Sequence, residues 1–337
     1  MLRSMYSGIS GMKVNQVKLD VIGNNLANVG TTAFKCSRTR FQDMLYQSEA
    51  TATGPSLNVG GTNGQQVGLG VKVSGIDRVV TQGMMQPTGR NLDVAMDGNS
   101  YFMVARGENT SVVKLKADYN GIDNGAGMEI KFSRDGAFAL DEQGNLLNSD
   151  GYRVLGYVVK AGAGKDSIEH DKATGKPTCN FVDADAKPAP KAQGTNLVPL
   201  AIPDVVKDGA GKDSKIISFS IEKDGQLKAV LEDGKVSVLG QIAMASFKNP
   251  EGLKTEGKNL YTNSANSGEP RIRAGIGGPA DKTKGFGDMV QGVLEMSNVD
   301  IAAQFTDMIV ANRSFQASSK MISTGDEILQ DIINLKR

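Results

Sequence analysis

Two copies of one glycine-rich sequence are the first candidates for chemistry. VVKAGAGKDSI occupies residues 158–168, and VVKDGAGKDSKI occupies residues 205–216. A phosphate-binding P-loop needs a glycine five residues before its Gly-Lys pair and a serine or threonine directly after the lysine. Both copies instead have valine and aspartate at those positions. The spacing argues against nucleotide binding, and a strand that runs into a hairpin turn explains both copies.

The single histidine, His170, is the next candidate, because a zinc site or a Ser-His-Asp triad would have to use it. It stands among charged residues in a polar stretch, and we interpret it as a solvated loop residue. The acidic pairs Asp141-Glu142 and Glu232-Asp233 flank glycine turns and lack the spacing of a calcium-binding loop. We therefore expect no catalytic residues, no metal site and no cofactor.

The two cysteines, Cys36 and Cys179, lie far apart in the sequence and do not indicate a disulfide framework. Cys179 lies in a polar stretch that also contains Lys165, Lys172 and Lys176. A thiol that is exposed among cations has a lowered pKa and is reactive. Cys179 is therefore a candidate reactive thiol, with an unremarkable surface cysteine as the alternative. We expect Cys36 to serve packing.

Charge and composition limit the class of partner. The 337 residues carry 38 basic and 37 acidic side chains, for a net charge of +1. This balance argues against nucleic acid or an anionic membrane as a partner. No apolar run approaches the ~18 residues of a transmembrane helix, and the first residues lack the apolar core of a signal peptide. The absence of tryptophan and the 5% of aromatic residues argue against an enzyme pocket.

Both ends of the chain have the heptad spacing of long amphipathic helices. We predict a terminal helical domain made of residues 1–30 and 297–337, in which Ser297 and Asp300 start the second helix as a capping box. Such long apolar seams need other helices, and we expect them to pack between subunits. The seam residues are Leu2, Met5, Ile9, Met12, Leu19 and Leu26 at one end and Leu294, Ile301, Met308, Phe315, Ile322 and Leu329 at the other.

Three asparagines, Asn24, Asn25 and Asn28, stand in the last part of the first helical seam. Asparagine in a seam costs stability but fixes register and orientation among similar helix packings. We therefore assign the three side chains to the register or junction of the packed helices. The alternative is an intramolecular coiled coil that ends at NVGTTAF, with asparagine as its exit signal.

The middle of the chain has strand signals. Residues 131–147 and 218–240 alternate apolar and polar side chains around Asp-Gly and Gly-Asn turns, as successive hairpins do. We predict an α+β fold, in which long terminal helices form a coiled-coil-like base and the middle forms a mainly β, hairpin-rich body. The expected body comprises residues 72–157 and 197–296, with a connector at 31–71 and a small insert or reduced outer domain at 158–196.

The ends of the chain also resemble a known family. SGISGMKVNQVKLDVIGNNLANVGTTAFK is similar to the N-terminal signature of bacterial flagellar rod and hook proteins, and LEMSNVDIAAQFTDMIVANRSFQASSK is similar to their C-terminal segment. Residues 66–104 and 239–270 resemble body segments of the same family, in the family's order. Within the family, SGISGM, GGTNGQQVGLGV and LEMSNVDIAAQFTDMI look most like hook members.

The resemblance implies a structural subunit that polymerises with itself into the curved tube that passes torque from rod to filament. It implies a distal rod protein, hook cap and hook–filament junction proteins as partners. It also implies export through the flagellar type III apparatus to the extracellular flagellum, without a cleaved signal peptide. Some hooks of the family carry a cysteine–lysine cross-link between subunits, which would involve Cys179 and Lys165 here. The alternatives are a distal rod protein and a secreted β-rich binding module with terminal coiled coils.

Overall fold

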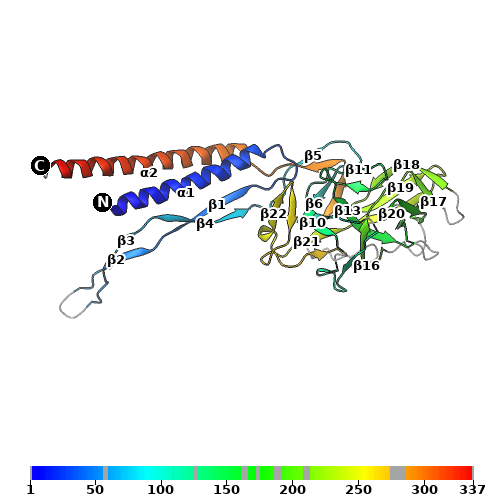
Figure 1. The fold of residues 1–337 in the computed structure, drawn as a ribbon, viewed down its shortest axis with the longest axis horizontal. Helices are drawn as coiled ribbons and strands as arrows, with labels where there is room; N and C mark the ends of the chain where they lie inside the picture. Colours follow the sequence, from blue (N-terminus) through cyan, green and yellow to red (C-terminus); the bar gives the residue numbers. More distant parts are fainter. Residues whose placement is uncertain are drawn as a thin grey trace. The chain divides into compact units, whose positions relative to one another are not determined.

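The structure is a computed structural model that describes residues 2–55, 60–108, 110–124, 127–160, 166–171, 175–184, 192–207, 213–273 and 286–335. Its contacts divide the chain into two compact units. The terminal unit comprises Met1–Gly30, Lys35–Val79 and Val299–Arg337, and the body comprises Thr31–Phe34 and Val80–Asn298. Figure 1 shows two long helices from opposite ends of the chain and a body of strands, so the predicted α+β class is confirmed.

The terminal unit has three layers, with α1 in the middle. Helix α2 packs on α1, and a two-stranded ribbon packs along α1 as well. The ribbon is tied to the helix at Ser10, whose hydroxyl accepts the Val71 amide at 3.3 Å, and by an Arg3–Glu49 ion pair of 2.7 Å. The elements are α1 (Leu2–Ala27), β1 (Ser37–Asp43), β2 (Tyr46–Ala50), β3 (Gln65–Gly68), β4 (Val71–Arg78) and α2 (Ile301–Leu335).

The ribbon differs from the expected connector. Residues 48–66 lack a hydrophobic period, yet β1 pairs with β4 and β2 pairs with β3, both antiparallel. In β1 and β4, alternate residues are half-buried, whereas β2 and β3 are exposed throughout and are joined by backbone hydrogen bonds. The four residues 31–34 belong to the body, whereas residues 35–79 belong with the helices.

The body is built from antiparallel pairing around β7 and β13, which each pair with several other strands. The described part of its core holds three apolar clusters, and in the two larger ones Phe102 packs edge-on against Phe138 and Tyr101 against Phe247. One sheet joins β7 through β24, and β6 and β5 pair with β25 and β26. The remaining elements are β5 (Met85–Pro87), β6 (Val94–Asp97), β7 (Ser100–Arg106), β8 (Val113–Leu115), β9 (Ile122–Asn124), β10 (Glu129–Ser133), β11 (Ala139–Leu140), β12 (Leu146–Leu147), β13 (Arg153–Val159), β14 (Ile168–His170), β15 (Pro177–Asn180), β16 (Ala192–Pro199), β17 (Val205–Lys207), β18 (Asp213–Ile221), β19 (Gln226–Leu231), β20 (Val236–Ile242), β21 (Met244–Ser246), a 3₁₀ turn (Pro250–Gly252), β22 (Lys254–Gly257), β23 (Leu260–Thr262), β24 (Arg271–Ile272), β25 (Asp288–Gln291) and β26 (Val293–Glu295).

Three of the four predicted hairpin turns are present. Strands β18, β19 and β20 pair in sequence around Gly225 and Gly234, and β11 pairs with β12 around Gly144, each glycine having a positive φ. The predicted hairpin turn at Asp135-Gly136 is wrong, because strand β10 pairs with β7 and β23 and not with β11. Gly136 instead allows the backbone to pass close to Val94, since a methyl carbon on Gly136 would lie 1.7 Å from the Val94 carbonyl oxygen.

The two repeat copies start equivalent hairpins. Lys160 pairs with Asp166 at the base of the first, and Lys207 pairs with Asp213 at the base of the second. Strand β15 pairs with β14 on one side and with β17 on the other, so the described part of the 158–196 segment is continuous with the body's sheet. The expectation of a solvated loop histidine is wrong: His170 ends β14 and is half-buried, and burial lowers its pKa.

Candidate assembly interface

The contact between α1 and α2 is lined by small residues. A methyl carbon added to Gly8 would lie 3.2 Å from the Ile322 side chain, and one added to Gly11 would lie 3.0 Å from the Ser318 hydroxyl. Gly325 of α2 makes a similar close approach to α1. Small side chains allow helix backbones to approach closely, and larger side chains of the facing helix, Ile322 and Met5, pack over the glycines.

The predicted seam of α1 overlaps this contact in part, because a methyl carbon added to Gly325 would lie 3.3 Å from the Met5 side chain. Four other contact positions directly precede predicted positions, and all four are glycine or polar residues: Gly8, Gly11, Lys18 and Asn25. Hydropathy alone therefore selects the neighbouring stripe. In that stripe Met5, Ile9, Met12, Leu19 and Leu26 are half-buried, and the side chain of Leu2 lies outside the described residues.

The predicted seam of α2 is present from Met308 onward. Met308, Phe315, Ile322 and Leu329 are half-buried at every seventh residue, and small residues such as the buried Ala311 stand between them. Ile301 is 47% exposed and lies outside this face. Whether these seams also pack between subunits stays a prediction.

The start of α2 differs from the expected one. Leu294 lies in strand β26, opposite Gln86 of β5, and is not helical. The amides of Ala302 and Ala303 donate to the Asp300 carboxylate at 2.9 and 3.2 Å, so Asp300 is the N-cap instead of Ser297. An aspartate at this position satisfies two of the free amides of the first turn.

A second apolar stripe of α2 is uncovered. In an α-helix, residues separated by about seven and four positions share one face. The stripe, called the outer stripe below, has exposed fractions from 45% to 86% and consists of Val310, Met321, Ile328, Ile332 and Leu335. Every residue of β2 and β3 is exposed too, and a two-stranded hairpin without a packed face is marginally stable in water.

The three asparagines divide into one buried and two surface residues. The amide nitrogen of Asn25 donates to the Ser37 carbonyl at 2.8 Å and to the Gln304 side chain at 3.1 Å. Its side-chain oxygen accepts the Ser37 amide at 2.9 Å, so Asn25 satisfies both backbone groups of that residue. Asn28 donates to the Asn24 carbonyl at 2.9 Å and closes the end of α1. Asn25 is therefore the junction residue between α1, β1 and α2.

Replacing Asn25 by alanine should destabilise the terminal unit selectively. The amide and carbonyl of Ser37 would lose their partner, at a cost of about 1–3 kcal/mol for each group that stays unpaired. Hydrogen exchange should show faster exchange of the Ser37 amide with unchanged protection in the body. Asn24→Ala is the control, because that side chain is exposed. Equal exchange at Ser37 in both variants would contradict the assignment.

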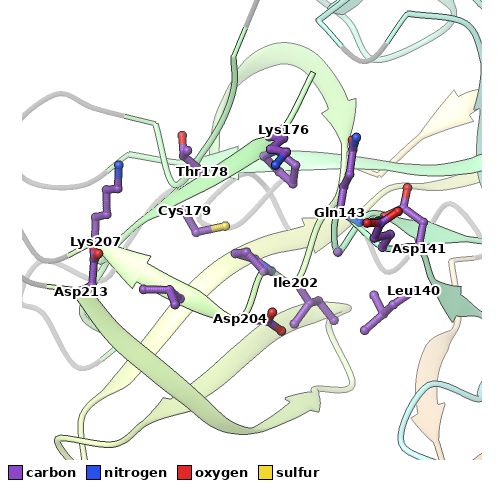
Figure 2. Close-up of a pocket in the computed structure, with 15 residues that line it drawn as sticks. Leu140, Asp141, Gln143, Lys176, Thr178, Cys179, Ile202, Asp204, Lys207 and Asp213 are labelled. Carbon is purple, nitrogen blue, oxygen red and sulfur yellow. Dashed lines mark hydrogen bonds between the residues drawn. The ribbon is translucent and has the colours of Figure 1, made fainter. Parts of the chain in front are cut away.

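The prediction that Cys179 is a reactive thiol is wrong, because the residue is buried beside a cavity. Figure 2 shows this pocket, which has a volume of about 550 Å³ and is bordered by charged side chains such as Lys176, Asp204 and Lys207. The Cys179 side chain itself is only 1% exposed, and burial raises the pKa of its thiol to about 12. The thiol lacks both the exposure and the lowered pKa that a reactive cysteine needs. Lys165, its suggested cross-linking partner, lies outside the described residues.

Cys179 should therefore resist alkylation in the folded protein. At pH 8 a thiol with a pKa near 12 is thiolate in roughly one molecule in 10⁴, and only the thiolate attacks the reagent. Iodoacetamide labelling followed by peptide mass spectrometry should modify Cys36, which is half-buried, well before Cys179. Denaturant should make the two rates similar. Rapid labelling of Cys179 in native protein would contradict its burial.

The described residues contain neither a cluster of metal ligands nor a membrane-spanning helix. In the ranges that the structure describes, no group of three or more histidine, cysteine, aspartate or glutamate side chains could hold a metal ion. No helix among those ranges combines the length and the hydropathy that crossing a membrane requires.

Comparison with family models matches three segments of the chain. Residues 5–35 match the family described as flagella basal body rod protein. Residues 121–238 match the D1 domain of flagellar hook protein FlgE/F/G, and residues 290–335 match the C-terminal family of flagellar basal body rod FlgEFG protein. The matched segments thus include both helices and much of the body.

Individual relatives bear both rod and hook names. The flagellar basal-body rod protein FlgG of Bacillus subtilis is 39% identical over 337 residues, with 100% of both chains covered. The flagellar hook protein FlgE of Borreliella burgdorferi is 30% identical over 467 residues, also with 100% of both covered. The crystal structure of Helicobacter pylori flagellar hook protein FlgE2 aligns with a TM-score of 0.39 at 11% identity, covering 63% of this chain and 100% of that one. This chain therefore belongs to the flagellar rod and hook protein family.

Proposed function

We propose that this chain is the subunit of a flagellar hook, a curved tube in which identical copies associate through their terminal units and transmit torque. The observation that carries the proposal is the outer stripe of α2, which is apolar, exposed and unpaired with α1. Identical subunits that associate through two different surfaces form an open helical polymer. The role is mechanical and involves no reaction on a substrate.

A hook subunit would also have neighbours in the flagellum and a location outside the cell. A tube of identical copies needs a neighbour at each end, and the family resemblance suggests a distal rod protein below and hook cap and hook–filament junction proteins above. We infer export to the outside of the cell through the flagellar type III apparatus without cleavage. Mass spectrometry of assembled material should find the chain starting at residue 1 or 2, and a processed start would contradict this inference.

A distal rod subunit is the second candidate, and a specific observation favours it. The alignment with the rod protein of Bacillus subtilis spans 337 residues, whereas the alignment with the Borreliella burgdorferi hook protein spans 467 and needs long insertions in the hook chain. A rod is a straight shaft, whereas a hook is curved. The two proposals therefore differ in the shape of the polymer.

Electron cryomicroscopy of polymer grown from purified chain tests the proposal. Curved tubes support the hook, and straight tubes of the same subunit support the distal rod. A chain that stays monomeric at high concentration, with both units folded, would overturn both and favour a binding module that does not polymerise.

A further inference from the structure

The chain passes four times between the terminal unit and the body, and the body segments next to these four passages form one hydrogen-bonded cluster. The chain passes between the units after residues 30, 34, 79 and 298. Within the body, the segments next to these crossings bond to one another. We call this set the junction cluster, and it comprises the segments 31–34, 81–84 and 295–298.

Segment 31–34 is bound into the body on several sides. The Ala33 amide donates to the Glu295 carbonyl at 2.8 Å, and the Phe34 carbonyl accepts the Asn298 amide at 3.3 Å. The Asn259 side chain donates to the Thr32 carbonyl at 3.0 Å. Ala33 is 1% exposed and has a φ of 55°, an unfavourable conformation for alanine that surrounding contacts must maintain. The segment is therefore held in a single conformation by the body.

Segment 81–84 is bound to the other end of the cluster. The Gly83 amide donates to a Glu295 carboxylate oxygen at 3.0 Å, and the Asn298 side chain donates to the Thr81 carbonyl at 3.1 Å. A methyl carbon on Gly83 would lie 1.9 Å from the Met296 carbonyl oxygen, so only glycine permits this approach. One residue, Glu295, thus bonds both segments.

A buried ion pair fixes Glu295 in place. The Arg134 Nε donates to its second carboxylate oxygen at 2.9 Å, with side chains that are 0% and 1% exposed. The same guanidinium donates to the Gly98 carbonyl at 2.6 Å and lies over the Tyr101 ring. A charge buried this completely depends on its partner, because water cannot replace it. Arg134 therefore anchors the cluster to the core of the body.

We propose that the junction cluster is the coupling site of the molecule: it fixes the directions in which all four chain passes leave the body, and so sets how stiffly the two units move together. The inference rests on the proposed function in one respect, that a torque-bearing polymer needs such coupling. Asn259 and Asn298 are positioning residues in this scheme, since their side chains hold the main-chain carbonyls of Thr32 and Thr81.

Electron spin resonance on the monomer tests this coupling. Spin labels at Lys13→Cys in α1 and Glu142→Cys in the body, in a Cys36→Ser/Cys179→Ala background, report the distribution of distances between the units. Asn298→Ala and Asn259→Ala should each broaden the distribution about twofold or more and speed exchange of the Ala33 amide at least about tenfold, because local opening becomes easier. Body unfolding should stay cooperative, with a small shift in midpoint.

Asn249→Ala is the matched control, because its side chain likewise donates to a main-chain carbonyl, that of Asn266, outside the cluster. It should leave the distance distribution unchanged. Faster Ala33 exchange without broadening in both cluster variants, or equal broadening in the control, would overturn the coupling role. Thr32→Val, which removes the 3.2 Å bond to Asp135, is a third variant should an asparagine variant fail to fold. Because the measurement uses monomer, failure of the chain to polymerise would count against the proposed function alone.

Discussion

Placing charge on the outer stripe of α2 should abolish polymerisation while the monomer stays folded. In Ile328→Asp/Ile332→Asp, each change removes an isoleucine whose burial contributes about 1.5–3 kcal/mol, and the aspartate resists transfer into an apolar contact. Because 1.4 kcal/mol corresponds to a tenfold change in an equilibrium constant, the critical concentration should rise more than about a hundredfold. Sedimentation of polymer across a concentration series measures it.

The control for this prediction carries the same charge elsewhere on α2. Ser319→Asp/Ser323→Asp adds two carboxylates at exposed positions outside the stripe, and it should polymerise nearly as the unaltered chain does. Circular dichroism of all three monomers should agree, because neither pair of substitutions touches the contact with α1. Normal polymer from the isoleucine variant would show that the outer stripe is not an interface.

Breaking the buried Arg134–Glu295 pair should give the largest loss of body stability. In Arg134→Met the Glu295 carboxylate stays buried without its partner, which costs about 3–5 kcal/mol in comparable sites. The double variant Arg134→Met/Glu295→Gln should recover part of this loss, because the uncompensated charge is gone while the glutamine still accepts the Gly83 amide. Denaturant unfolding of all variants gives the coupling energy as a double-mutant cycle.

Lys116→Met is the matched control for this loss. It breaks the Lys116–Glu269 pair, whose side chains are 43% and 60% exposed, and exposed pairs contribute about 0–1 kcal/mol. If Arg134→Met cost no more than this control, the guanidinium would not anchor the body.

Periodicity in the sequence predicted the helices well and their contact poorly. Heptad spacing located α1 and α2 because long amphipathic helices repeat their apolar residues. Ile322 and Met5 of the predicted seams lie in this contact, but much of the face is glycine, serine and asparagine, as at Gly8 and Ser318, and these residues carry no hydropathic signal. Asn25 illustrates the same limit: its type suggested a junction, but its partner Ser37 follows only from the fold.

Turns and burial in the body show a similar division. Asp-Gly dipeptides predicted the turns at Gly225 and Gly234, because glycine adopts positive φ without steric cost. At Gly136 the same dipeptide forms no hairpin turn. Glycine is needed there because the backbone passes close to Val94 of strand β6, which is distant in the sequence. For Cys179, the polar neighbours in the sequence gave the wrong environment, because alternate residues of strand β15 point to opposite faces of the sheet. The burial of Arg134, the largest fully buried side chain among the described residues, could not be predicted from any pattern in the sequence.

The placement of α1 and α2 at opposite ends of the chain has a consequence for the order of folding. Lys18 and Asp307 lie 289 residues apart in the sequence, so during synthesis α1 has no partner until nearly the whole chain has been made. Closing so long a loop in an unfolded chain carries a large entropic cost. Once the body has folded, however, Phe34 and Asn298 are hydrogen-bonded, and only short tethers separate the two helices from that point. We therefore expect the body to fold first and the helix pair to form last, after translation has ended.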